Sequence, residues 1–199
     1  MAGSNRQSAC GNRERQLMKV EAIEKARKYL EKITPLKSDC GLLCGSLCCK
    51  KNDKDDSDNS DNFGMWLFPF EDELYKNNSN FKVIKADGNS SYPFLLCGYS
   101  GKENNFCKRE ERPLFCRFFP YFPIIKNRRI KIIIHPTALK MCPAISSKLK
   151  ITSQFSRAVK KAVYLMLSQN DEEITQYLVE TGEYLKSMAE FAGKILGFE

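Results

Sequence analysis

Apolar residues recur at helical spacing near both ends of the chain. In residues 12–33 charged positions separate them, and Pro35 follows. Residues 151–166 and 174–191 carry two further stripes. We predict an N-terminal helix and a C-terminal helical hairpin, with Asn170 and Glu173 as a capping box. The apolar positions behind this prediction are Leu17, Val20, Ile23, Leu30 and Ile33; Ile151, Phe155, Val159, Ala162, Val163 and Met166; and Ile174, Tyr177, Leu178, Thr181, Leu185, Met188 and Phe191.

The middle of the chain changes to short apolar runs separated by turn residues. Residues 64–69, 81–86, 92–97 and 129–134 read as short strands, and residues 70–75 as a short helix with acidic residues at its start. The Asp87-Gly88-Asn89 turn separates two of the strands. This alternation predicts an α+β fold with short antiparallel strands.

A polar stretch interrupts this region. Residues 50–62 are almost all Lys, Asp, Asn and Ser, so we expect a solvated, mobile loop. The stretch lacks the glycine and the final glutamate of a calcium-binding loop. We expect residues 12–146 to form one domain and residues 147–199 to pack on it as the helical hairpin.

Composition bears on the compartment. The 199-residue chain begins with a polar segment that lacks the apolar region of a secretory signal, and it has no apolar run long enough to span a membrane. We therefore expect a cytoplasmic protein in a reducing environment, where disulfides rarely persist.

Nine cysteines are the most distinctive feature of the sequence. The count is odd, and the adjacent pair Cys48-Cys49 cannot easily form a disulfide within itself, so metal ligation is favoured over disulfides. Cys10 lies upstream in a polar segment and is left out of the ligand set. The predicted metal ligands are Cys40, Cys44, Cys48, Cys49, Cys97, Cys107, Cys116 and Cys142.

The spacing of the first cysteines limits how they bind. On one regular helix Cys40, Cys44 and Cys48 would share a face but spread over about 12 Å along the axis. Sulfurs around one zinc lie within about 4 Å of each other. Either the segment turns, or its cysteines divide between two centres. Gly41 and Gly45, each directly after a cysteine, favour a turn.

The later cysteines lie in distinct contexts. Pro113 suits the first turn of a helix, and the helix dipole together with Arg117 would favour the thiolate form of Cys116. The alternative is that Cys116 is a buried apolar residue among its aromatic neighbours. A proline directly after a ligand cysteine, as in Cys142-Pro143, recurs in iron–sulfur proteins.

His135 and two arginines are further candidates. The only histidine could be a ligand or a proton carrier, but a lone histidine at a strand end more often satisfies a hydrogen bond. Arg112 and Arg117 could orient an anionic substrate, or form salt bridges with Glu110, Glu111 or the charge of a cluster.

These motifs together resemble the YkgJ-type family, also called CxxCxxCC proteins, which are described as zinc- or iron-chelating domains. The resemblance spans residues 40–143. Its most specific part is Arg112-Pro113-Leu-Phe-Cys116-Arg117-Phe-Phe-Pro120, and Cys142-Pro143 completes it. The family's eight cysteines would correspond to the ligand set above. The first box departs from the family name, since three residues rather than two separate its cysteines.

The resemblance supports metal binding, of zinc or an iron–sulfur cluster. We expect a small, irregular metal-bound core in a structural or redox-sensing role, because no convergent acid, base or nucleophile set accompanies the eight cysteines. The cysteine pattern is also similar to that of flagellin lysine N-methylases, which leaves an iron–sulfur enzyme of methyl transfer or redox chemistry as an alternative. Nucleic-acid binding is a third, weaker reading. It rests on the absence of Asp and Glu from residues 113–170 and on the net charge of +8.

Overall fold

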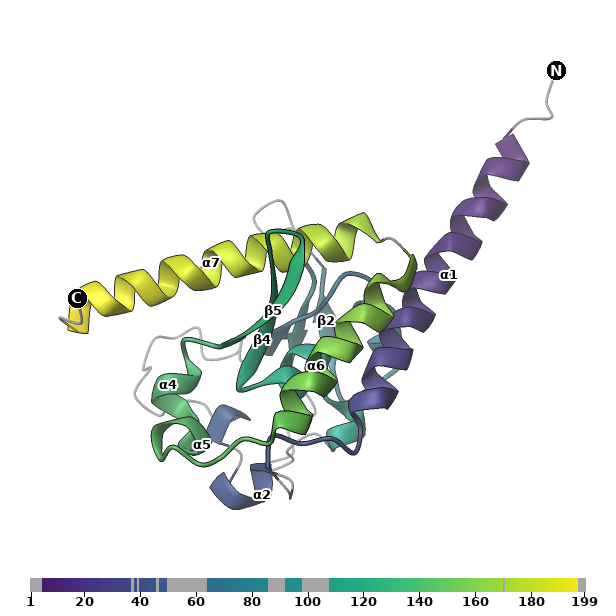
Figure 1. Cartoon of the computed structure of the whole chain (residues 1–199). Coiled ribbons are helices and arrows are strands. Elements are labelled where there is room, and N and C mark those ends of the chain that lie inside the picture. The colour runs from purple at the N-terminus through teal and green to yellow at the C-terminus, as the bar shows by residue number, and fades with distance from the viewer. Residues whose placement is uncertain are drawn as a thin grey trace.

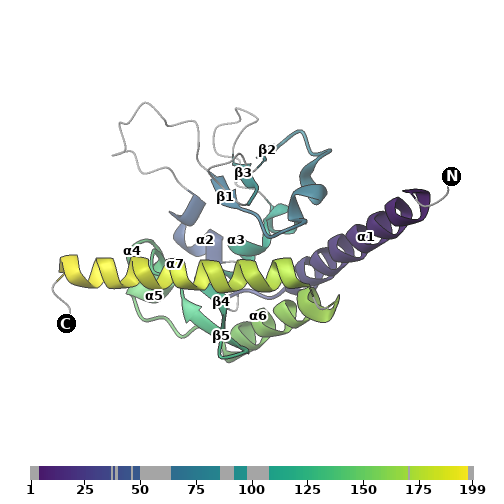
Figure 2. The same ribbon diagram turned by 90° about the horizontal axis from the view of Figure 1, so that it is seen from above.

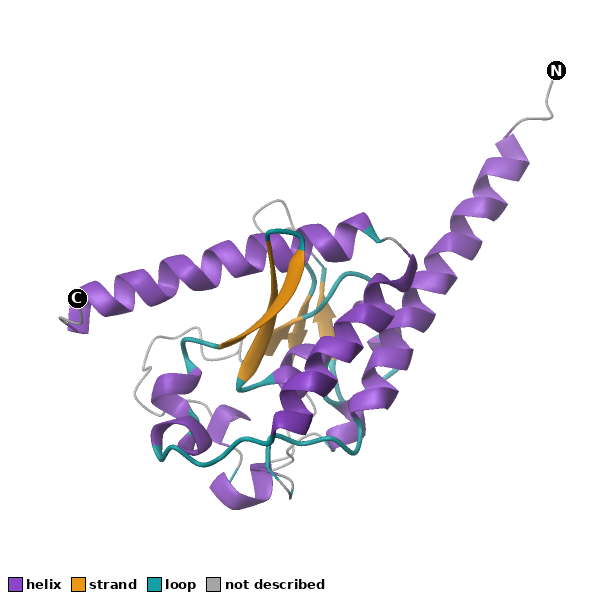
Figure 3. Ribbon diagram, in the orientation of Figure 1, coloured by secondary structure: helices purple, strands orange, loops and turns teal. Residues whose placement is uncertain are grey.

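The computed structural model describes residues 5–36, 38, 40–45, 47–49, 64–85, 92–97, 108–169 and 171–196. The predicted loop at residues 50–62, together with Asn170 and Cys107, lies outside these ranges. The fold is α+β, with helices around two small antiparallel sheets (Figure 1, Figure 3). Within the described ranges, no helix carries an apolar stretch long enough to cross a bilayer.

The elements follow one another in the order α1 (Asn5–Leu30), α2 (Cys40–Cys44), the 3-10 turn η1 (Leu47–Cys49), β1 (Gly64–Trp66), η3 (Glu71–Tyr75), β2 (Lys82–Ile84), β3 (Phe94–Leu96), η4 (Arg109–Glu111), α3 (Leu114–Phe118), β4 (Tyr121–Lys126), β5 (Arg129–Ile134), α4 (Ala138–Met141), α5 (Pro143–Ser146), α6 (Ser153–Met166), η5 (Leu167–Gln169) and α7 (Glu172–Leu196).

The predicted strands are present and pair antiparallel. β3 is the centre of a sheet of order β1-β3-β2, and the pair of Trp66 with Phe94 places their rings edge to face with centroids 4.9 Å apart. In Figure 2 this sheet and α6 lie on opposite sides of α7. The short helix expected at residues 70–75 is the 3-10 turn η3.

Sequence reasoning missed the strand β4. It pairs with β5 from Tyr121–Ile134 to Lys126–Arg129, and the turn residues Asn127 and Arg128 both have positive φ, as in a two-residue hairpin of the primed type. Pro123 lies within β4, and a proline argues against a central strand. In a two-stranded hairpin every strand is an edge, so Pro123 is tolerated.

The two predicted C-terminal helices form as α6 and α7, but they are not packed along each other as a tight hairpin. They meet at the link and then diverge (Figure 1). α6 packs mainly along α1, whereas α7 packs mainly across β4. The apolar stripes of α6 and α7 therefore pack against different elements.

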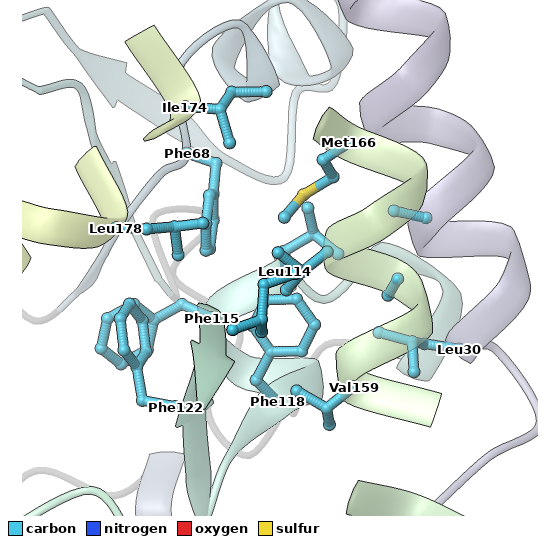
Figure 4. Packing of buried hydrophobic residues seen from close by; sticks show 14 of the residues in the cluster. Leu30, Phe68, Leu114, Phe115, Phe118, Phe122, Val159, Met166, Ile174 and Leu178 are labelled. Carbon is cyan, nitrogen blue, oxygen red and sulfur yellow. The ribbon is translucent and has the colours of Figure 1, made fainter. Parts of the chain in front are cut away.

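The main core lies where these elements meet (Figure 4). Phe68 is fully buried at its centre. Its ring contacts Phe118, Phe122 and Tyr177 at centroid distances of 5.7, 6.2 and 4.6 Å. Such aromatic pairs add favourable edge and face contacts to the hydrophobic gain from burial. The core therefore joins the segment after β1 to α3, β4 and α7.

The helix α1 is longer than predicted, and its first half projects beyond the rest of the fold (Figure 1). Ile23 and Leu30 are fully buried as expected, but Leu17 is 56% exposed. The predicted apolar face therefore contacts the core only over the C-terminal half of the helix.

The N-cap of α7 is Asp171, so the capping box predicted at Asn170 is placed one residue too early. The backbone N–H of Ile174 donates to Asp171 Oδ1 at 3.1 Å. The other carboxylate oxygen lies 3.4 Å from Lys19 Nζ. This buried carboxylate thus caps α7 and ties it to α1.

Replacing Asp171 with alanine should lower the free energy of unfolding by about 1–2 kcal/mol, because it removes an N-cap and one of the two carboxylates, with Glu173, that pair with Lys19. Urea denaturation monitored by circular dichroism measures this. Glu183→Ala, at an exposed position within α7, is the control and should change stability little. Equal effects of the two substitutions would contradict the capping role.

Candidate functional site

The first cysteine box folds as two short helical pieces separated by a turn. α2 carries Cys40 and Cys44 one helical turn apart, and Gly45 then adopts a left-handed φ of 58°. η1 follows and carries Cys48. The turn expected at Gly45 is present, and Cys48 does not continue along the axis of α2, whereas the turn expected at Gly41 is wrong because Gly41 lies within that helix.

Four cysteines line one small cavity of about 90 Å³, which we call the cysteine cavity. Cys40, Cys44 and Cys48 come from the first box, and Cys142 comes from the junction of α4 and α5. α2 lies at the same end of the molecule as α4 and α5 in both views (Figure 1, Figure 2). The rest of its lining is mostly apolar and includes Phe119 and Met141.

Cys142 is held in an extended conformation between two short helices. Its φ and ψ are −99° and 108°, and Pro143 occupies the first position of α5. The N–H of Cys142 donates to Ala138 O, and its carbonyl accepts from Ile145 N and Ser146 N. The proline thus starts a new helix at the cysteine, as the dipeptide suggests.

A second, larger cavity of about 650 Å³ adjoins the first, and we call it the large cavity. Cys48, Phe119 and Met141 line both cavities. Cys116, in the first turn of α3 as predicted, lines the large cavity only. Five of the predicted ligands therefore line two cavities that have three wall residues in common.

The remaining predicted ligands are not placed there. Cys97, half-buried after β3, lines neither cavity, and Cys107 and the side chain of Cys49 lie outside the described residues. Within the described part of the chain, no three His, Cys, Asp or Glu side chains form a group that could hold a metal ion. The cysteines share a cavity without forming a closed ligand set.

Arg117 has a different role from either one predicted. It is buried, and its three nitrogens donate to the carbonyls of Arg112, Arg27 and Glu110, each at 2.7 Å. Burial and the nearby Arg27 lower its pKa to about 10, so it remains charged at neutral pH. Its guanidinium is committed to the backbone and does not face a substrate.

Two more arginines complete this contact, which we call the arginine clasp of Arg27, Arg109 and Arg117. Arg109 donates to the carbonyls of Leu30 and Glu31 at 3.2 and 2.9 Å, and also to that of Ile33. Arg27 Nη2 donates to the carbonyls of Glu110, Glu111 and Arg112. The clasp fixes the end of α1 against η4, just before the segment that carries Cys116.

Glu71 connects the clasp to α3. This fully buried carboxylate accepts hydrogen bonds from Leu114 N at 2.7 Å and Phe68 N at 3.2 Å, and Arg27 Nε lies 3.8 Å away. Burial raises the pKa of Glu71, while Arg27 and the two N–H donors oppose that shift. Sequence reasoning did not single out this residue, because one acidic residue among several gives no signal of its burial.

His135 satisfies a local hydrogen bond, as expected for a lone histidine at a strand end. Its Nδ1 accepts from Thr137 N at 3.3 Å and contacts Thr137 Oγ1 at 2.8 Å. Because the backbone N–H must donate, Nδ1 is the acceptor and Nε2 carries the proton. Phe115, Phe119 and Phe122 surround the ring, and burial lowers the pKa of His135 to about 4.

Comparison with protein families, with curated proteins and with solved structures found no match to this chain. The likeness to the YkgJ-type family therefore rests on the cysteine and Arg-Pro motifs alone.

The free energy of unfolding should fall as the pH drops from about 6.5 towards 4. In this range His135 binds a proton in the unfolded chain but stays neutral in the folded one. Between pH 7 and pH 5 the effect should be on the order of 2 kcal/mol. Denaturation in urea at both pH values tests this, with His135→Gln as the comparison. The variant should lose less stability over this range, and an equal loss would contradict the prediction.

Proposed function

We propose that the protein binds metal through cysteine thiolates, with a centre in the cysteine cavity. The observation that carries the proposal is that Cys142 lines the same cavity as Cys40, Cys44 and Cys48. Residues so distant in the sequence meet there only through the fold. Thiolates select zinc, copper(I) or iron–sulfur clusters, and zinc and iron–sulfur are the two candidates here.

The chemistry of the donors supports this reading. Apolar surroundings penalise a lone charge, so several thiolates in one mostly apolar cavity need a bound cation to offset their charge. A bound metal would connect α2 and η1 to the α4–α5 junction. It would stabilise the fold by the free energy of binding, because the unfolded chain does not preform the site.

The role of the metal in this proposal is structural or redox-sensing. His135 lines the large cavity beside Cys48 and Cys116, and burial lowers its pKa, which keeps it neutral. Arg117 is committed to backbone carbonyls.

An iron–sulfur enzyme related in pattern to flagellin lysine N-methylase is the second candidate. The observation that favours it is the large cavity, which shares Cys48 with the cysteine cavity and is lined by Cys116. A cavity of this size beside a cluster could admit a substrate. A brown protein whose absorbance is bleached by dithionite would support this candidate, and a colourless zinc protein would count against it.

Protein purified without oxygen should contain zinc or iron, measured by elemental analysis together with an absorbance spectrum. Cys48→Ala and Cys142→Ala should each reduce the bound metal by at least about tenfold, the typical loss on weakening a metal site. Cys10→Ala is the matched control and should retain it. A folded wild-type protein with neither metal would refute the proposal, and unchanged metal in Cys142→Ala would remove that residue from the ligand set.

A further inference from the structure

The walls of the large cavity are mainly aromatic and apolar. Its volume of about 650 Å³ lies within the range typical of small-molecule sites. Side chains from β1, α3, α7 and the segment before β3 converge on it. The aromatic residues among them are Trp66, Tyr92, Phe115, Phe119, Tyr177 and Tyr184.

The charges around this cavity are unlike those of the chain as a whole. The chain has 32 lysines and arginines and a net charge of +8, yet none of the described residues that line the cavity is a lysine or an arginine. The charged lining residue is Glu180, whose carboxylate accepts from Tyr92 Oη and Gln176 Nε2, each at 2.7 Å. This arrangement disfavours an anionic ligand.

The wall of the cavity also carries a hydrogen-bond donor on the ring of His135, a residue that is 8% exposed. His135 lines the cavity, and its Nδ1 is engaged by Thr137, which leaves the proton on Nε2. No hydrogen bond joins Nε2 to any residue that the structure describes. A ligand acceptor that meets Nε2–H gains a hydrogen bond in mainly apolar surroundings, and that bond adds specificity to the affinity from burial.

We infer that the large cavity binds a small, mainly apolar organic molecule without negative charge, and that His135 Nε2–H donates a hydrogen bond to an acceptor on it. The aromatic walls supply the affinity through burial, and the His135 donor orients the molecule. The inference depends on the cavity and its side chains, and it holds whether or not the cysteines carry metal.

Trp66 makes the inference directly measurable. It is the only tryptophan of the chain, it lines the cavity, and it is 43% exposed. A ligand that enters should change its fluorescence. Suitable probes are three naphthalenes: the neutral ketone prodan, a carbonyl-free dimethylaminonaphthalene of the same size in which a CH2 group replaces the carbonyl of prodan, and the anionic anilinonaphthalene sulfonate.

Prodan should quench Trp66 in a saturable manner, and the anionic dye should bind at least about tenfold more weakly, because the site offers no cation to its sulfonate. In His135→Phe, which keeps an aromatic ring but removes the donor, affinity for prodan should fall by about tenfold. The affinity of this variant for dimethylaminonaphthalene should not change. An unchanged affinity shows that the cavity itself is intact. His135→Gln, which retains an N–H donor, should restore part of the loss.

Three results would overturn the inference: no saturable response to prodan, tighter binding of the anionic dye, or equal loss of both neutral probes in a folded His135→Phe protein. Tyr164→Ala, at an exposed site on α6 away from the cavity, is the control and should bind prodan as the wild type does. Should His135→Phe fail to fold, the wild-type preference for prodan over its carbonyl-free analogue decides the role of the donor.

Discussion

The arginine clasp is the interaction on which the arrangement of this fold depends. The last carbonyls of a helix have no partner within it and need donors from elsewhere. At the end of α1 the guanidiniums of Arg109 and Arg117 supply those donors, and Arg27 returns bonds from α1 to the carbonyls at residues 110–112. The chain that leads to α2 and the chain that leads to α3 therefore leave from one fixed point. The clasp therefore determines where both cysteine-bearing segments begin.

Arginine suits this role because its planar group presents several donors in a fixed geometry and stays charged when buried. A lysine has no such fork, so it could not reach three carbonyls on separate residues in the manner of Arg117. The cost of burying these cations is offset by the carbonyl dipoles and by Glu71, which in turn accepts from Phe68 N and Leu114 N. The arginine clasp with Glu71 and the aromatic core thus stabilise each other, because the backbone N–H groups of Phe68 and Leu114 bind the Glu71 carboxylate.

Much of the secondary structure could be predicted, and much of the packing could not. The stripes of α6 and α7 were clear because a helical period repeated over many residues leaves little ambiguity. β4 was missed because Pro123 argues against a strand, although the hairpin turn at Asn127-Arg128 was a usable signal. The pairing of α6 with α1 rather than with α7 joins residues far apart in the chain, and periodicity carries no information on that choice. The sequence also carried no information on the partners of Arg117. Its sequence context suggested a partner of opposite charge, but its partners are backbone carbonyls.

The cysteine spacing excluded one continuous helix around a single ion and left two alternatives, a turn or a division of the cysteines between two centres; the structure has a turn at Gly45. The meeting of Cys142 with the first box depends on the whole fold, and the sequence supported it only through a resemblance. The two cavities that result share Cys48. Their apolar walls affect both the thiols of the first cavity and any ligand of the second. Where water is excluded, an uncompensated thiolate is costly, its attraction to a cation is strong, and an apolar molecule is favoured over an ionic one. A single physical property, the low polarity of this end of the molecule, therefore underlies both the metal centre proposed for the thiols and the uncharged ligand inferred for the space beside them.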